Sequence, residues 1–309
     1  MMSAQTTGSA TATPLVACLR LGGHWRARVL LRFSDPVGLL GQSWPDVTAA
    51  DWLEALAEPE ELFRTGGEVE LLKDSRSSMV VRRRLPLGNA RPEVFCKLSR
   101  RRNLLRKLFG LFRRTRPSRN WQIGWDLLAG GISTALPLAV LEKRIFGLRL
   151  VAIIITQSLL PGKTLERFVR EDAPALACGQ QRRLTAELAE LIRRLHDHDF
   201  FHRDLKGVNI FVHSGNASNL RFYVLDLDGC GPHGQAHHKK AKSLGRLARA
   251  SLGWPVIHRT DRLRFLRAYL AGPSGDARNG QAHSWADWKN WWCHIDDQVR
   301  RKSRSRSIR

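Results

Sequence analysis

The pattern of apolar and polar positions changes type along the chain. Between residues 68 and 98, short apolar segments alternate with turn-forming ones, which is typical of antiparallel strands. A helix is predicted over 117–130, because this stretch ends in a pair of glycines at 130–131. Two further strands are predicted over 137–144 and 148–157, which are rich in Val, Ile and Leu.

A long amphipathic helix is predicted after these strands. One isoleucine and four leucines of QQRRLTAELAELIRRLHDHDF recur on a single helical face, namely Leu184, Leu188, Leu191, Ile192 and Leu195. Short β-like segments follow at 209–212 and 222–227, and helical periodicity then returns. The pattern therefore predicts an α+β fold with two lobes. A small antiparallel β-sheet with one helix forms the N-lobe, and the C-lobe is mainly helical.

These changes divide the chain into four predicted parts. Residues 1–14 are small and polar and are expected to be disordered. A β-rich lobe is expected over 15–157 and a helical lobe over 158–299, with a hinge near Thr156–Gly162. The basic Ser/Arg stretch 300–309 is expected to be a second disordered tail.

Composition narrows the class of partner. The chain has 309 residues, and 51 Lys and Arg against 28 Asp and Glu give a net charge of +23, which predicts a polyanionic partner. Five scattered cysteines without a CxxC pair argue against a disulfide framework or a zinc site and fit a reducing cytosol. The longest apolar run, at 148–155, is too short to cross a bilayer, and no signal peptide is visible. We therefore expect a cytoplasmic protein, with an anionic membrane surface as a further candidate partner.

The clearest chemistry lies in FFHRDLKGVNIFV at 200–212. Phosphoryl transfer requires a carboxylate that orients the acceptor hydroxyl, oxygen ligands for Mg²⁺, and cations beside the phosphates. Asp204 would be the catalytic carboxylate, and Lys206 would contact the transferred phosphate. Asn209 and, 17 residues later, Asp226 would be the metal ligands. A turn explains one such Asp or Asn alone, but the whole spacing favours a kinase-like site.

The loop resembles the catalytic loop of protein kinases, and the longer chain resembles the bacterial lipopolysaccharide kinase (Kdo/WaaP) family. The similarity covers about residues 65–272 and includes VFCKLSR, NWQIGWDLLAGG, LIRRLHDHDFFHRDLKGVNIFV and YVLDLDG. The resemblance implies a bilobal protein-kinase-like fold that uses ATP and Mg²⁺. It also implies an inner-core sugar of lipopolysaccharide, heptose or Kdo, as acceptor, at the cytoplasmic face of the inner membrane.

The resemblance alone implies further nucleotide-binding residues. Lys97 in VFCK corresponds to the strand lysine that holds the α- and β-phosphates. The turn that carries Ser75, Ser77 and Ser78 would cover the phosphates, although it has no GxGxxG pattern. Backbone near Gln157 would receive the adenine.

Three departures from the kinase pattern leave questions open. The helix expected to supply a Glu partner for Lys97 carries Asn120 and Gln122 instead, and Asp226 is an alternative partner. Either Asp226 or Asp228 would serve as the metal ligand, and we choose Asp226 because it directly follows the apolar segment. No APE-like segment is present, which disfavours a protein substrate.

Two other functions are compatible with the residues. One is a protein Ser/Thr kinase, and the other is a non-catalytic kinase-fold protein that binds an anionic partner. No RNA- or DNA-specific motif is visible, so no specific nucleic-acid partner is expected. The densest basic segment, 100–119, is compatible both with an interfacial helix on anionic lipid and with an ordinary amphipathic helix.

Overall fold

The fold is taken from a computed structural model. It describes residues 14–34, 44–64, 66–100, 114–145, 148–214, 220–232, 237–254, 256–271 and 288–307. The predictions for residues 1–13 and for 101–113, most of the basic segment, lie outside these ranges. The described chain forms two compact units: unit 1 falls within residues 1–131 and 135–158, and unit 2 within 132–134 and 159–309.

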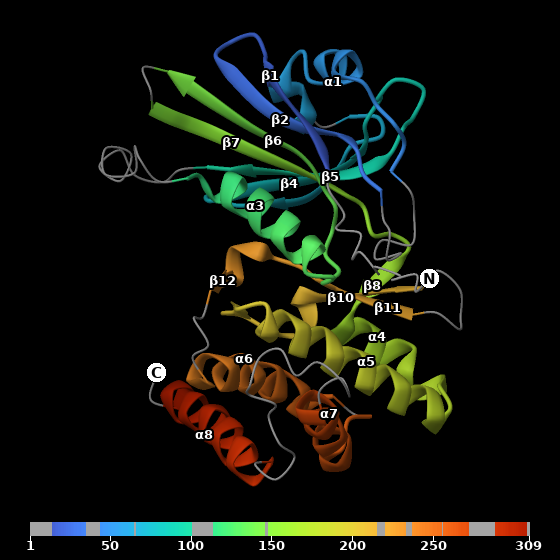
Figure 1. The fold of residues 1–309 in the computed structure, drawn as a ribbon, viewed down its shortest axis with the longest axis vertical. Helices are drawn as coiled ribbons and strands as arrows, with labels where there is room; N and C mark the ends of the chain where they lie inside the picture. The colour runs from blue at the N-terminus through green and yellow to red at the C-terminus, as the bar shows by residue number, and fades with distance from the viewer. Residues whose placement is uncertain are drawn as a thin grey trace, which may run out of the picture. The chain divides into compact units, whose positions relative to one another are not determined.

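Unit 1 is built on a seven-stranded antiparallel sheet (Figure 1) with the order β1-β2-β6-β7-β5-β4-β3. The strands are β1 (Leu15–Arg20), β2 (Trp25–Arg32), β3 (Glu70–Asp74), β4 (Ser78–Arg84), β5 (Glu93–Ser99), β6 (Pro137–Ile145) and β7 (Leu148–Gln157). The predicted strands between 68 and 157 are all present. The pair β1 and β2, which extends the sheet beyond β6, was not predicted as strands.

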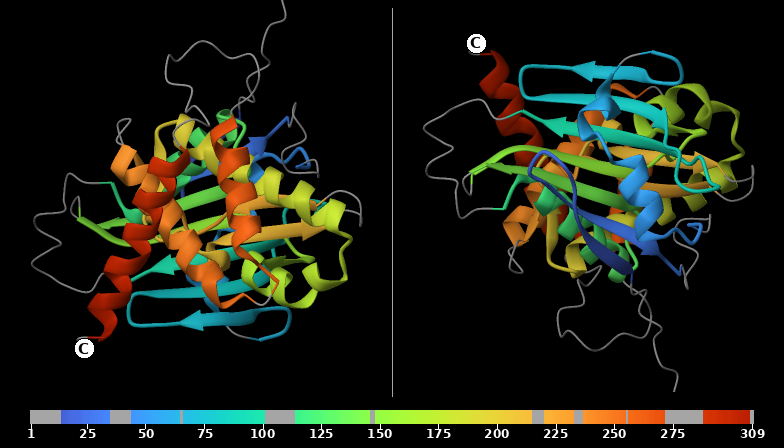
Figure 2. Two further views of the ribbon diagram at one scale, coloured as in Figure 1. Left: turned by 90° about the horizontal axis from the view of Figure 1, so that it is seen from below. Right: turned by 90° about the horizontal axis from the view of Figure 1, so that it is seen from above.

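Helices cover opposite sides of this sheet (Figure 2). Helix α1 (Ala49–Ala55) begins with a capping box between Thr48 and Asp51, and a short 3₁₀ helix, η1 (Pro59–Phe63), follows it. Helix α3 (Arg116–Ala129) begins at Thr115, whose hydroxyl accepts from the Ser118 N–H, and ends at Gly130, as predicted. Its buried apolar side chains, which include Trp121 and Leu128, belong to the face that packs on β6 and β7.

Unit 2 consists mainly of helices with two small antiparallel sheets. The helices are α4 (Leu165–Glu171), α5 (Cys178–Asp197), α6 (His237–Ala250), α7 (Arg259–Ala271) and α8 (Trp288–Ser307), with 3₁₀ turns η2 (Ala173–Ala175), η3 (Gly207–Asn209), η4 (Leu227–Gly229) and η5 (Ser251–Gly253). The strands are β8 (Gly162–Thr164), β9 (Phe200–His202), β10 (Ile210–Ser214), β11 (Leu220–Val224) and β12 (Cys230–Pro232), with β10 between β11 and β8, and β12 paired with β9.

Aromatic and imidazole side chains join the helices of unit 2. The buried His196 on α5 shares a 2.8 Å hydrogen bond with the Tyr269 hydroxyl on α7. Tyr269 in turn meets Trp291 on α8 edge to face, with ring centroids 5.7 Å apart. Trp291 therefore belongs to the core.

Helix α8 extends into the stretch that the sequence predicts to be a disordered tail. Residues 300–307 are helical, so the prediction of a disordered tail from residue 300 differs from the structure. One contact that supports these last turns is the i,i+4 ion pair of Arg300 with Asp296 at 2.6 Å. Among the described residues, no helix is long and apolar enough to cross a membrane.

Candidate active site

The loop after β9 is fixed by a fully buried histidine. His202 Nδ1 accepts the Asp204 backbone N–H at 3.1 Å, so the ring proton sits on Nε2, which donates to the Leu225 carbonyl at 3.0 Å. Burial lowers the pKa of His202 below its ordinary value, and this outweighs the hydrogen bond to Leu225 and the charges of Asp226 and Asp204. A neutral His202 therefore connects the backbone of Asp204 with the segment that carries Asp226.

A glycine leaves room for this histidine. A Cβ on Gly229 would lie 2.6 Å from His202 Cε1, closer than real Cβ contacts occur. The Gly229 carbonyl accepts the Arg203 N–H at 2.8 Å, and the Arg203 guanidinium donates to the Asp228 carbonyl at 2.8 Å. These contacts hold the turn after β11 against the loop. The sequence motif did not single out Gly229 or Arg203.

Asp204 and Lys206 form an ion pair at 2.7 Å, and both side chains are about half exposed. Partial burial acts to raise the pKa of Asp204, but the hydrogen bond and charge of Lys206 outweigh it and hold the pKa below its ordinary value. Asp204 is therefore a carboxylate at neutral pH. That state is required of a group that accepts a hydrogen bond from an acceptor hydroxyl.

Asn209 and Asp226 lie at the same end of the β10–β11 hairpin. Ile210 on β10 pairs with Val224 on β11. Directly beyond this pair, the Leu225 N–H donates to the Asn209 carbonyl at 2.9 Å. Asn209 is 8% exposed, and its Nδ2 donates to the Asp204 carbonyl at 2.8 Å. Because the amide nitrogen is used in this way, the side-chain oxygen is the atom left for a metal.

Asp226 has a backbone conformation that non-glycine residues seldom adopt. Its φ is 54°, in the left-handed region, and its carbonyl accepts the Gly229 N–H at 2.8 Å. Backbone strain of this kind is concentrated at functional sites. In the described ranges, no group of three or more His, Cys, Asp or Glu side chains is placed so that it could hold a metal ion. Mg²⁺ bound through one carboxylate, one amide and phosphate oxygens needs no such group, so the residues fit this ion.

In unit 1, Lys97 and Gln157 lie on neighbouring strands. Lys97 on β5 is opposite Ile154 on β7, and Gln157 ends β7 opposite Val94. Lys97 is half-buried. Helix α3 contains no glutamate, as its sequence indicated.

The helix residues considered as substitutes for that glutamate differ in their surroundings. Asn120 is buried in α3. Gln122 donates to Asp126 on the same helix at 2.9 Å.

The three predicted serines lie together in the β3–β4 turn. Ser75 Oγ donates to the Ser78 carbonyl at 2.9 Å and lies 3.4 Å from the hydroxyls of Ser77 and Ser78. Arg100 closes the turn, since it donates to Asp74 at 2.6 Å and to the Ser75 carbonyl at 3.1 Å. The turn is thus pre-formed by its own hydrogen bonds, and the sequence motif gave no indication of Arg100.

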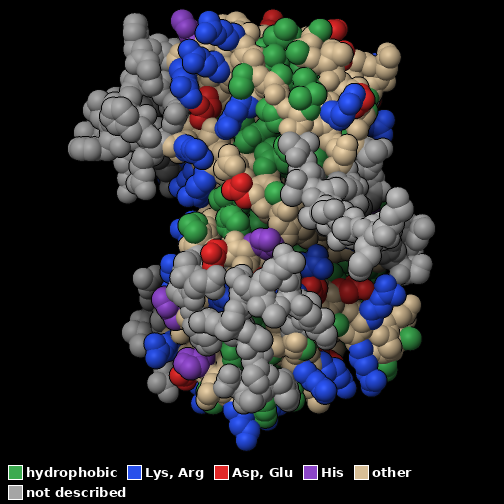
Figure 3. Space-filling view, in the orientation of Figure 1, with side chains coloured by type: hydrophobic (Ala, Val, Ile, Leu, Met, Phe, Trp, Pro, Cys, Tyr) green, Lys and Arg blue, Asp and Glu red, His purple; other side chains and the backbone are tan. Residues whose placement is uncertain are grey.

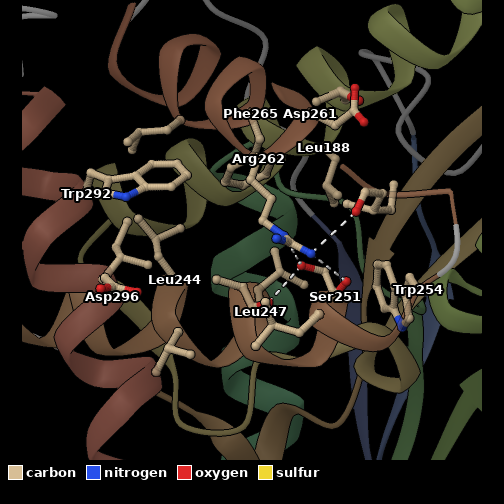
Figure 4. Close-up of a pocket in the computed structure, with 17 residues that line it drawn as sticks. Leu188, Leu244, Leu247, Ser251, Trp254, Asp261, Arg262, Phe265, Trp292 and Asp296 are labelled. Carbon is tan, nitrogen blue, oxygen red and sulfur yellow. Dashed lines mark hydrogen bonds between the residues drawn. The ribbon is translucent and has the colours of Figure 1, made fainter. Parts of the chain in front are cut away.

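An apolar pocket of about 180 Å³ lies among α5, α6, η5, α7 and α8 (Figure 4). Arg262 lies in it with its guanidinium bonded to the hydroxyl and carbonyl of Ser251 and to the Ile257 carbonyl. Trp254, which also lines it, packs on the loop after β9: a Cβ on Gly207 would lie 2.5 Å from the Trp254 ring. Trp254 therefore connects the wall of this pocket with that loop.

The family model described as the lipopolysaccharide kinase (Kdo/WaaP) family matches residues 96–269, more than half of the 309-residue chain. Among solved structures, the chain is similar to "WaaP in complex with acyl carrier protein", with a TM-score of 0.59 and 19% identity over 82% of this chain and 97% of that one. Comparison with curated proteins gives no match.

The matched region contains Lys97, Gln157 and the whole segment from Asp204 to Asp226, whereas the serine turn precedes it. Fold and family together define a kinase, a phosphotransferase of the class that acts on lipopolysaccharide. The chain belongs to the lipopolysaccharide kinase (Kdo/WaaP) family.

Proposed function

We propose that the protein transfers the γ-phosphate of ATP, with Mg²⁺, to a hydroxyl of a lipopolysaccharide inner-core sugar, heptose or Kdo. Unit 1 would be the nucleotide-binding lobe and unit 2 the catalytic lobe of a bilobal protein-kinase-like enzyme. The substrate lies at the cytoplasmic face of the bacterial inner membrane, so the enzyme would work there as a peripheral protein.

The observation that carries this proposal is the arrangement of the loop after β9. Asp204 is ionised, Lys206 lies 2.7 Å from it, and Asn209 is oriented by the Asp204 carbonyl. In the proposed reaction the Asp204 carboxylate orients the acceptor hydroxyl and takes its proton, and Lys206 contacts the phosphate in transfer.

The remaining roles are assigned by position. Asn209 and Asp226 would hold Mg²⁺, which neutralises phosphate charge when bound. Lys97 would hold the α- and β-phosphates, and the turn with Ser75, Ser77 and Ser78 would cover them through its backbone N–H groups. Backbone at Gln157 would receive the adenine.

The test is ATP consumption with purified lipopolysaccharide core as acceptor. Asp204→Asn keeps the shape of the side chain but removes the carboxylate, so we expect turnover to fall by at least about a hundredfold. Glu187→Gln, which removes an exposed carboxylate of α5, is the matched control and should leave turnover unchanged. Wild-type turnover in Asp204→Asn would contradict the assignment, and faster phosphorylation of a generic basic protein than of the core would favour a protein kinase.

A second measurement separates the two candidate metal ligands. Asp226→Asn should raise the Mg²⁺ concentration needed for half-maximal turnover by tenfold or more, because one anionic oxygen ligand is lost. Asp228→Asn is the control, since the contact that Arg203 makes to Asp228 uses the backbone carbonyl. The opposite result would assign the metal to Asp228.

A further inference from the structure

A second pocket with a different character lies in unit 1. It has a volume of about 330 Å³ and is formed by β1, β2, β6 and the first turn of α3. Its charged lining consists of four arginines and one carboxylate, Arg20, Arg26, Arg28, Arg144 and Glu142. Figure 3 shows Lys and Arg side chains gathered along one side of unit 1. The pocket is thus a concave site with a surplus of positive charge.

The strand register places like charges opposite each other in this pocket. Arg20 on β1 pairs directly with Arg26 on β2, and Arg26 pairs with Glu142 on β6. Arg28 lies two residues beyond Arg26 and therefore on the same face of the sheet. Like charges directly opposite each other destabilise a strand pair. An anion bound between the two arginines would attract both and so turn this repulsion into a net attraction.

The one carboxylate in the pocket is already engaged. Glu142 is 6% exposed and accepts from the hydroxyls of Thr115 at 2.6 Å and Ser118 at 2.9 Å and from Arg144 at 2.6 Å. No ion pair of Arg20 or Arg26 is formed within the described part of the chain. Glu142 is therefore engaged by other donors, and its single charge faces four arginines.

Two further arginines are held in place around the pocket. The Arg28 guanidinium donates to the Ser118 hydroxyl at 3.2 Å and lies over the Trp121 ring at 5.8 Å. Arg144 Nε is buried and has no hydrogen-bond partner among the described residues. A buried donor without a partner is costly. The site thus offers pre-positioned guanidinium groups and one donor that is still to be satisfied.

The pocket is separate from the residues proposed to hold the nucleotide. Lys97, Ile154, Val140 and Arg28 form one row across β5, β7, β6 and β2. Three strand spacings place the backbones of Lys97 and Arg28 about 14 Å apart. One phosphate group cannot contact both side chains at hydrogen-bond distance if they stand upright on the sheet.

We propose that this arginine pocket is a second anion site, which binds a phosphate monoester separately from the nucleotide phosphates. Guanidinium groups bind phosphate oxygens through paired hydrogen bonds, and a volume of 330 Å³ suits a phosphorylated sugar or a lipid phosphate head. The inference rests on unit 1 alone and does not require the proposed acceptor. Its ligand chemistry is that of a phosphate monoester, whether free or at the head of a lipid.

The test is a binding measurement on the full chain with two probes. Glucose 6-phosphate represents the free monoester, and phosphatidylcholine vesicles that contain phosphatidic acid represent the lipid source. The variant is Arg20→Gln/Arg26→Gln, because both side chains are exposed and neither replaces a buried contact. Arg32→Gln/Arg84→Gln removes the same charge from exposed positions of β2 and β4 outside the pocket and is the matched control.

We expect the pocket variant to bind glucose 6-phosphate at least about tenfold more weakly, because two charged hydrogen-bond donors are lost, while the control variant binds as the wild type does. If the pocket variant loses binding to the phosphatidic acid vesicles alone, and the control variant does not, the site binds a lipid phosphate head, and this result also supports the proposal. Equal loss in both variants, no wild-type binding of either probe, or loss only in Lys97→Ala would overturn the proposal. Turnover with ATP and core, measured separately, reports on the proposed function and not on this site.

Discussion

The contact between Gly229 and His202 allows a quantitative prediction for Gly229→Ala. The added Cβ would lie 2.6 Å from His202 Cε1, which is 0.8 Å short of the 3.4 Å at which ordinary contacts begin. The imidazole is fully buried, and its two ring nitrogens are bonded at 3.1 Å to Asp204 and at 3.0 Å to Leu225. A ring displacement of that size lengthens at least one of these hydrogen bonds beyond about 3.2 Å.

The cost of Gly229→Ala has two parts. Overpacking in a dense interior costs about 1–3 kcal/mol, and a buried polar group that loses its partner costs about 1–3 kcal/mol. Since relaxation shares these costs, we expect a loss of about 2–4 kcal/mol in the free energy of unfolding. Because the displaced ring holds the Asp204 N–H, turnover should fall by about tenfold or more in protein that is still folded.

A nearby glycine provides the control. Gly231 lies two residues after Gly229, on β12, and a Cβ there would meet the Phe201 ring at 3.9 Å. Gly231→Ala should therefore change stability by no more than about 0.5 kcal/mol. Urea unfolding and ATP turnover of both variants give the comparison. Equal stability and equal turnover in Gly229→Ala and Gly231→Ala would refute the role assigned to His202.

Three further predictions follow from single residues. The pKa of His202 is lowered in the folded chain, so below about pH 6.5 the unfolded chain binds a proton on this imidazole that the folded chain does not, and the free energy of unfolding falls as the pH drops. His202→Gln should make this fall with pH less steep, by up to about 1.4 kcal/mol per pH unit. An unchanged slope in urea unfolding at several pH values would contradict this prediction. Glu142→Gln should destabilise unit 1 by about 1–3 kcal/mol, because a buried carboxylate that accepts from Thr115, Ser118 and Arg144 loses its charge, and thermal unfolding measures the effect. Burial raises the pKa of Cys96 to about 12, so N-ethylmaleimide at neutral pH should modify the exposed Cys18, Cys178 and Cys293 before Cys96. Mass spectrometry after labelling of the folded protein measures the order of modification. Early modification of Cys96 would contradict this prediction.

The candidate residues of the loop after β9 could be proposed from the sequence because their geometry is local. Asp204, Lys206 and Asn209 lie within six residues, and the hydrogen bond from Asn209 to the Asp204 carbonyl spans only five. The supporting contacts could not be predicted in the same way. His202 meets Gly229 because β9 pairs with β12, which joins segments about 28 residues apart in sequence. It also bonds to the Leu225 carbonyl, 23 residues further along the chain.

In the sheet, too, strands with a clear pattern in their own residues could be predicted, whereas pairing between distant segments could not. Strands β3 to β7 have clear apolar runs between turn-forming residues, and they were predicted. Strand β2 has a usable signal too, since buried Trp25, Ala27 and Val29 alternate with Arg26 and Arg28. Strand β1 has weaker evidence, because it is mostly exposed at the edge of the sheet. Its place beside β2 depends on pairing that its own residues do not encode.

The net charge of +23 predicts that the partner is an anion, but it does not predict where on the protein that anion binds. On α5, Arg183 pairs with Glu187, and Arg194 pairs with Glu190. Arg193 pairs with both Glu190 and Asp197, so three carboxylates of the same helix balance these three arginines. An exposed pair such as Arg183 with Glu187 contributes at most about 1 kcal/mol, and arginines that are already paired offer little to an outside anion. Arg20 and Arg26, by contrast, lie directly opposite each other, and neither forms an ion pair with a carboxylate among the described residues. An anion that recognises this chain should therefore respond to substitution of a few arginines in unit 1 and be nearly indifferent to those of α5.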